Sequence, residues 1–103
     1  MMMMLVMLTK LMMFGMKMYS KEIRNRIVLS VAAYAYEFKG DSIMSDSEFD
    51  ELSLKINPKE ETGNALMDKF FKNHFEPHTG MWIRAHPEIN KLDYLYKTYY
   101  KKS

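Results

Sequence analysis

The chain of 103 residues has no cysteine, only three prolines and four glycines, and a single tryptophan. The absence of cysteine excludes a disulfide scaffold, a thiolate zinc site and a cysteine nucleophile, and it suits a reducing, cytoplasmic compartment. The chain also lacks a large excess of one charge sign, because 15 Lys and Arg against 13 Asp and Glu give a net charge of only +2. That balance is far from the strongly basic composition of a dedicated nucleic-acid binder. The length allows one domain.

Methionine is abundant instead, and nine of the 12 methionines lie in residues 1–18, which contain Lys10 and Lys17 but no acidic residue. Lys10 interrupts the apolar run, so we predict no membrane span, which needs about 20 mainly apolar residues. A secretory signal is not indicated either. We interpret residues 1–18 as a Met-rich extension with three open explanations. The first is a reading frame extended upstream of a true start at Met16 or Met18. The second is a helix packed on the body. The third is a segment that binds a membrane surface or a partner, and such a segment could also form homo-oligomers.

Residues 19–103 are predicted to form a single all-α domain of four helices, built on an antiparallel helical hairpin over residues 19–57. Apolar residues recur in steps of three or four along a first helix, which Ser20 caps and Gly40 ends. An S-x-x-E sequence beginning at Ser45 predicts the start of the second helix. The link of about five residues makes the two helices antiparallel neighbours. The expected core faces contain Ile23, Ile27, Val31, Tyr34 or Ala35, Phe38, Phe49, Leu52 and Ile56.

Residues 64–103 are expected to hold the C-terminal helices, one from Asn64 to Phe75 and one from Pro87 to about Lys101. The apolar run over residues 81–83 is too short to distinguish a strand from a buried extended link. The expected core residues here are Leu66, Met67, Phe70, Phe71, Phe75, Ile89, Leu92, Tyr96 and Tyr99.

The residues with catalytic or metal-binding side chains do not form a recognised set. His74 and His78 at i,i+4 would share a helix face, and Glu76 adds a carboxylate, but Pro77 should end the helix between them. No Ser-His-Asp order, glycine-rich phosphate loop or zincin spacing is present. We therefore expect no metal, no catalytic residue and no enzymatic activity. The histidines, including His86, are expected to be surface or capping residues.

The C-terminal stretch KLDYLYKTYYKKS interleaves lysines with tyrosines. Lysines beside aromatic faces suit a weak, sequence-tolerant nucleic-acid surface, for which Lys97, Lys101 and Lys102 are the candidates. The simpler interpretation is an amphipathic helix that buries two tyrosines, with lysines in its last turn that complement the helix dipole.

One stretch resembles a known family. Residues 34–40, YAYEFKG, and residues 43–52, IMSDSEFDEL, look like the N-terminal Ia domain of NAD-dependent DNA ligases. In that family a helix with a tyrosine-rich end leads into an I-x-D-x-E-Y-D-x-L helix. The resemblance covers residues 20–56 and implies the same helical hairpin. Because the Ia domain closes over the nicotinamide mononucleotide half of NAD, it also implies a nucleotide-binding role for Tyr36, Asp46 and Asp50.

Two positions depart from the family pattern. Glu37 stands where a histidine is expected, and Phe49 stands where a second tyrosine is expected. Glu37 presents a negative charge to a phosphate-bearing ligand, and Phe49 lacks a hydroxyl, so the affinity for a mononucleotide should fall. The adenylated-lysine motif K-x-D-G is absent, and 103 residues cannot hold a nucleotidyltransferase domain. We therefore expect no ligase activity.

Three functions stay open. We favour a small non-catalytic interaction protein, of the kind that viral or mobile-element genomes encode, which binds and modulates a host protein through a ligase Ia-like scaffold and needs no cofactor. The second is a module that binds NAD or nicotinamide mononucleotide as a sensor or sponge, and the third is the weak nucleic-acid binder. The aromatic residues expected to be exposed for partner binding are Tyr36, Phe38, Trp82, Tyr94 and Tyr100.

Overall fold

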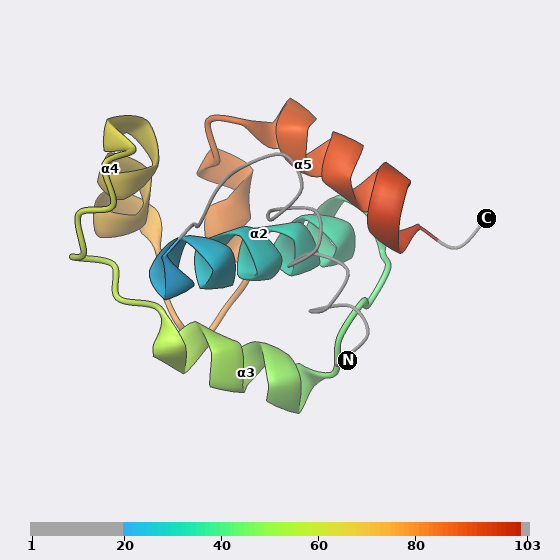
Figure 1. Ribbon diagram of the computed structural model, residues 1–103. Coiled ribbons are helices and arrows are strands. Elements are labelled where there is room, and N and C mark those ends of the chain that lie inside the picture. The colour runs from blue at the N-terminus through green and yellow to red at the C-terminus, as the bar shows by residue number, and fades with distance from the viewer. Residues whose placement is uncertain (1–19, 102–103) are drawn as a thin grey trace.

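A computed structural model describes residues 20–101, and the Met-rich extension over residues 1–18 lies outside them. The described chain is helical and contains no strand, which confirms the all-α prediction. None of its helices is long and apolar enough to cross a membrane. Helix α2 runs through the centre of these elements, with α3 on one side and α5 on the other (Figure 1). The elements are α2 (Lys21–Lys39), α3 (Asp46–Lys55), α4 (Ala65–His74), the 3-10 helix η1 (Met81–Ala85), α5 (Ile89–Leu95) and the π-helical turn η2 (Tyr96–Tyr100).

Helix α2 begins and ends where the sequence predicts. The Ser20 side chain accepts a hydrogen bond of 3.2 Å from the Ile23 N–H, and Gly40 takes a left-handed φ of 63°. Every residue from Val28 to Ala35 is buried, so this part of α2 is covered on all sides and not along one stripe. It contacts η1, α5 and α3. Helix α3 is thus one of several elements that contact α2, and a domain built on an α2–α3 hairpin stays a prediction.

The buried stretch of α2 ends at Ala35, and for this reason the prediction that Phe38 faces the core is wrong. Phe38 is exposed and stacks on Tyr34, with ring centroids 5.1 Å apart.

Helix α3 starts with the predicted capping box. The Ser45 Oγ accepts from the Glu48 N–H at 3.1 Å, and the Glu48 carboxylate accepts from the Ser45 N–H at 2.9 Å. These hydrogen bonds lower the pKa of Glu48. They fix the start of the helix, which ends at Lys55 and is followed by the buried Ile56.

An aromatic cluster joins α4 to η1. The rings of Phe71 and Phe75 lie 5.6 and 5.2 Å from the ring of Trp82, which is only 5% exposed. The expectation that Trp82 is exposed is therefore wrong, because the 3-10 turn directs its ring into this cluster. Leu66, predicted to face the core, is exposed, since it lies in the first turn of α4, ahead of the rings that meet Trp82.

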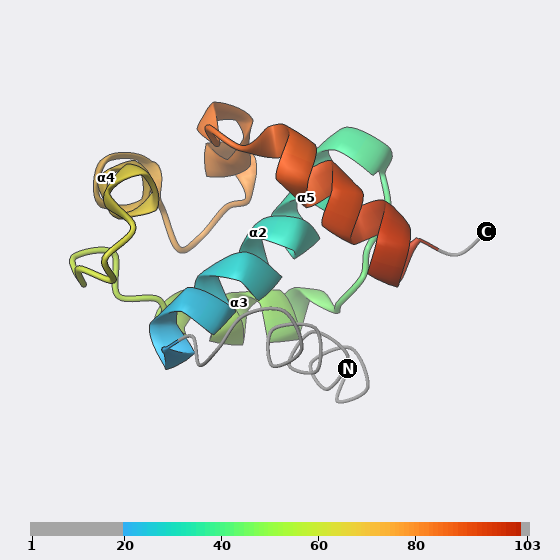
Figure 2. The ribbon, with the colours of Figure 1, turned by 45° about the horizontal axis from the view of Figure 1, so that its top comes forward.

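The last helix differs from the single helix predicted from Pro87. Helix α5 begins at Ile89, because the residues before it form a turn in which His86 Nδ1 accepts from the Glu88 N–H at 2.9 Å. At Tyr96 the α-helix gives way to η2. Figure 2 shows α5 and η2 lying across the second half of α2.

An arginine in α2 holds the connection between α3 and α4. Arg26 is buried, and its guanidinium lies 4.8 Å from the Phe71 ring centroid. All three guanidinium nitrogens are engaged, which ties residues 57–68 to α2. The acceptors are Glu22 Oε2 at 2.7 Å, Asp68 Oδ1 at 2.8 Å, the Asn57 carbonyl at 2.9 Å and the Glu60 carbonyl at 3.0 Å.

Candidate functional site

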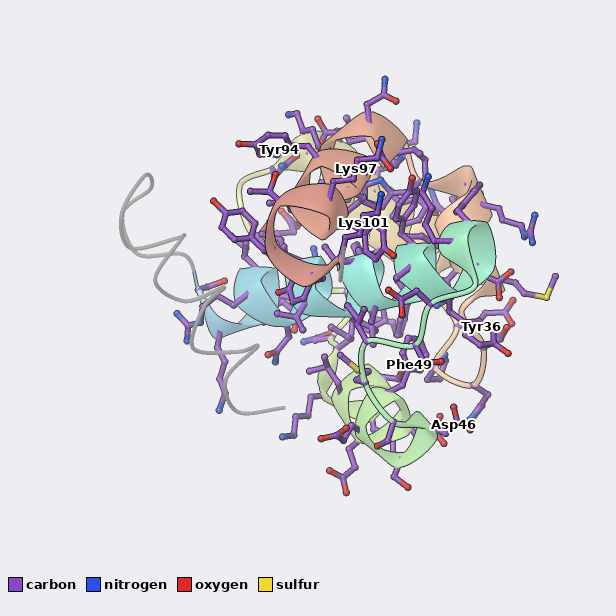
Figure 3. The ribbon with its side chains drawn as sticks, turned by 90° about the vertical axis from the view of Figure 1, so that its right-hand side faces the viewer. Tyr36, Asp46, Phe49, Tyr94, Lys97 and Lys101 are labelled. Atoms are coloured by element: carbon purple, nitrogen blue, oxygen red, sulfur yellow. The ribbon has the colours of Figure 1, made fainter. Side chains whose placement is uncertain are left out.

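An open hollow of about 370 Å³ lies between the C-terminal half of α2, the start of α3 and the loop after α4. Tyr36, Asp46 and Asp50, the residues implied by the ligase resemblance, all line it. Glu37 and Phe49, the two positions that depart from the family pattern, line it as well. Figure 3 shows Tyr36, Phe49 and Asp46 on one side of the molecule, where α2 and α3 face each other. The remaining lining residues are Ala32, Ala33, Ser42, Ile43, Met44, His78, Thr79 and Gly80.

Small residues make room for this hollow. Ala32 and Ala33 present only methyl groups toward it from α2. At Gly80, a Cβ atom would lie 3.5 Å from the Cβ of Ala33 and 3.6 Å from Cζ of Phe49. The loop backbone therefore lies against α2 and against the tip of the Phe49 ring. Phe49 forms part of the wall between α3 and this loop, a position in which a hydrophobic ring is stabilised by burial.

The hollow is lined by more acidic than basic groups. Glu37 Oε1 accepts hydrogen bonds from the Arg84 guanidinium, at 2.9 Å from Nη2 and 3.3 Å from Nε, so its charge is compensated from η1. Asp46 and Asp50 are exposed, and within residues 20–101 neither makes an ion pair. Two carboxylates without an ion-pair partner among residues 20–101, beside aromatic rings, favour a cationic, planar group over a bare anion.

Comparisons with protein-family models, curated proteins and solved structures give no match. The relationship to the ligase Ia domain therefore stays a prediction from residues 34–52. A simpler explanation exists for Asp46 and Asp50, because carboxylates at the start of α3 are stabilised by the helix dipole.

The residues predicted for partner binding are not brought together. Tyr36 and Phe38 are exposed on the last turns of α2, whereas Tyr94 is exposed on α5, well apart from Tyr36 (Figure 3). Trp82 is in the aromatic cluster. Tyr100 is half-buried with its hydroxyl out of reach of solvent, and burial raises its pKa to about 12.

The C-terminal tyrosines differ in exposure, because Tyr94 is exposed whereas Tyr96 packs toward the body. Tyr96 is buried, and its hydroxyl donates to Asp41 Oδ2 at 2.7 Å. Among the lysines, Lys97 forms a 2.9 Å ion pair with Asp93, Lys101 is exposed, and Lys102 lies outside the described residues. Nucleic-acid binding through this helix stays a prediction.

The histidines occupy three different environments. His74, the last residue of α4, stacks on Phe70 at 5.6 Å, and His78 lines the hollow. His86 is buried, and this desolvation lowers its pKa to about 4. Across the part of the chain that the structure describes, no three His, Asp or Glu side chains are placed to hold a metal ion.

Sequence reasoning missed the contribution of residues 78–80 to the hollow. Gly80, after Pro77, signals a turn, but nothing local to that turn indicates that it packs beside Ala33 and Phe49.

Proposed function

We propose that this chain is a non-catalytic module that binds nicotinamide mononucleotide, or the same half of NAD, in the hollow between α2 and α3. The observation that carries the proposal is that Tyr36, Asp46 and Asp50, from two different helices, line one hollow. In this proposal α2 and α3 correspond to the ligase Ia-like hairpin. A sensor or a sponge for the nucleotide needs nothing more than this binding step.

The chemistry of the lining supports an oxidised nicotinamide ring, which is planar and positively charged. Tyr36 offers a ring face for stacking, because its side chain is 61% exposed at the rim. Asp46 and Asp50 supply the opposite charge. His78 and Thr79 lie on the loop side of the hollow, where imidazole and hydroxyl donors suit the phosphate.

Weak binding is expected. Glu37 repels the phosphate, and the exposed Arg84 that pairs with it compensates only in part. A dissociation constant on the order of 1 mM, or about 4 kcal/mol of binding free energy, suits an open hollow of this kind.

Isothermal titration calorimetry of the full chain with nicotinamide mononucleotide tests the proposal. We expect saturable heat that Tyr36→Ala abolishes. The matched control is Tyr94→Ala, because Tyr94 has nearly the same exposure, 62%, and lies on another helix. The absence of heat at millimolar ligand, or equal loss in both variants, would remove the proposal.

A second candidate function is binding of a host protein. It is favoured by three exposed apolar side chains, Tyr36 and Phe38 on α2 and Met81 on η1. Arg84 of η1 links the two elements, since its guanidinium lies 5.7 Å from the Phe38 ring centroid and pairs with Glu37. Exposed aromatic residues beside an arginine are typical of interface hot spots.

A pulldown with the tagged full chain tests this second function. We expect a stoichiometric partner that is lost with Phe38→Ala and kept with Leu54→Ala, a change at another exposed apolar residue. Retention of the same partner by Phe38→Ala would contradict the assignment of this surface.

A further inference from the structure

A second and larger groove, of about 480 Å³, lies on the opposite side of α2 from α3, where α2 meets α4 and α5. Four half-buried apolar side chains on three helices line it: Ile23, Ile27, Met67 and Leu95. Buried Phe71 and Leu92 also contribute to it. The lining of the groove is therefore mainly apolar.

The charged groups in the groove already have partners. Arg26 is held by Glu22 and Asp68, and Glu88 pairs with Lys91 at 2.7 Å. Two uncharged polar side chains of the lining are engaged as well: the Thr62 hydroxyl donates to Asp68 Oδ1 at 2.7 Å, and the Asn64 side-chain oxygen accepts from the Met67 N–H. A ligand recognised by charge would have to displace these contacts, so the lining favours an apolar occupant.

The chain itself supplies such an occupant next to the groove. Residues 1–19 directly precede Ser20, the N-cap of α2, and Ile23, on the first turn of α2, already lines the groove. The segment carries nine methionines, two lysines and no acidic residue in its first 18 positions. Methionine has a flexible, polarisable side chain that fills irregular apolar gaps.

Reach and tethering favour this segment over any other occupant. Nineteen extended residues span about 60 Å, whereas the whole of α2 is about 28 Å long, so about nine extended residues suffice to run the length of α2. A short tether also gives an effective concentration of about millimolar, which a second copy reaches only in concentrated solution.

We infer that the Met-rich segment over residues 1–18 docks in the groove formed by α2, α4 and α5 of its own chain. Docking covers the exposed parts of Ile23, Ile27, Met67 and Leu95 with methionine side chains. The groove then belongs to the core of the domain and is not a free surface for a partner.

Photo-crosslinking of the full chain tests this inference. The chain has no cysteine, so Lys91→Cys attaches a benzophenone at one position only, on the rim of the groove. Glu51→Cys is the matched control, an exposed position on α3, on the other side of α2 (Figure 1). Peptide mass spectrometry maps each crosslink, and mixing isotope-labelled with unlabelled chain separates links within one chain from links between two.

We expect links from position 91 to residues 1–18 of the same chain, and none from position 51. Reaction with Met67, a lining residue, reports that the label reaches the groove. Links to Met67 without links to residues 1–18, equal reaction from both positions, or links only between copies would each overturn the inference. The last result would make the groove a contact between two chains.

Discussion

The hydroxyl of Tyr34, in the buried part of α2, donates a hydrogen bond of 2.5 Å to the carboxylate of Asp93 in α5. Burial is the main cause that raises the pKa of Tyr34 to about 12, and this hydrogen bond is the second cause. The Tyr34 hydroxyl, with help from Lys97, lowers the pKa of Asp93 to about 2. Because Asp93 also lies 3.6 Å from Lys39, it fixes α5 to the half of α2 that carries Tyr36.

Removal of this hydroxyl should destabilise the domain. We expect Tyr34→Phe to lower the free energy of unfolding by about 1–2 kcal/mol, because a hydrogen bond to a charged acceptor is lost. Urea unfolding measures the change. Tyr94→Phe is the control, since that residue is exposed and should change stability by less than about 0.5 kcal/mol. Equal effects of the two variants would show that the Tyr34–Asp93 hydrogen bond contributes nothing to stability.

Substitution of Arg26 should lower the free energy of unfolding more than most other substitutions do. Arg26→Met leaves Glu22, which is 6% exposed, with an uncompensated charge, so we expect a loss of about 3–5 kcal/mol in unfolding free energy. Arg26→Lys should restore little, because an ammonium cannot replace three nitrogens held in a plane.

Arg84→Met is the control for this experiment. Arg84 also forms an ion pair, with Glu37, but its side chain is 57% exposed, so the expected loss is below about 1 kcal/mol. Comparable losses for Arg26→Met and Arg84→Met in thermal or urea unfolding would contradict a structural role for the Arg26 network.

His86 should make stability depend on pH in the weakly acidic range. Its pKa is lowered to about 4 by burial, from 6.5, so the folded chain binds fewer protons than the unfolded chain between these values. The stability from neutral His86 is therefore complete above pH 6.5 and is lost as the pH falls toward 4. We expect His86→Gln to flatten the melting temperature over this range, and His78→Gln, at an exposed histidine, to leave it unchanged. A pH dependence that survives His86→Gln would exclude this residue as its source.

Glu37 offers a gain-of-binding prediction. Glu37→His removes the negative charge from the hollow and introduces the residue that the ligase resemblance expects there. We predict about tenfold tighter binding of nicotinamide mononucleotide, or roughly 1.4 kcal/mol. Glu51→His is the control, because Glu51 is exposed outside the hollow. Unchanged or weaker binding by Glu37→His would argue against a phosphate near position 37.

Local signals predicted much of the fold. The Ser20 cap, the left-handed Gly40 and the Ser45 capping box each depend on residues a few positions apart, so the sequence alone is enough to place them. The burial of Trp82 and the Arg26–Asp68 pair depend on residues distant in sequence, and no local pattern reports such contacts.

The site divides in the same way. The resemblance over residues 34–52 predicted Tyr36, Asp46 and Asp50 as site residues, because they lie on two consecutive helices within that stretch. The loop over residues 78–80 completes the hollow only because α4 and η1 pack together. The spacing of apolar residues in the sequence gives no sign of this contact. Helical spacing did separate exposed Tyr94 from buried Tyr96, as predicted, but it did not indicate that Tyr100 is half-buried.

Nucleotide binding in the hollow is tested by calorimetric titration of nicotinamide mononucleotide into the full chain and into Asp50→Asn, with Glu51→Gln as the control. We expect saturable binding by the parent chain and by Glu51→Gln. We also expect binding by Asp50→Asn to be weaker by a factor of about ten, because a carboxylate facing the cationic ring is neutralised. No heat at millimolar nucleotide, or binding that Asp50→Asn leaves unchanged, would contradict nucleotide binding in the hollow.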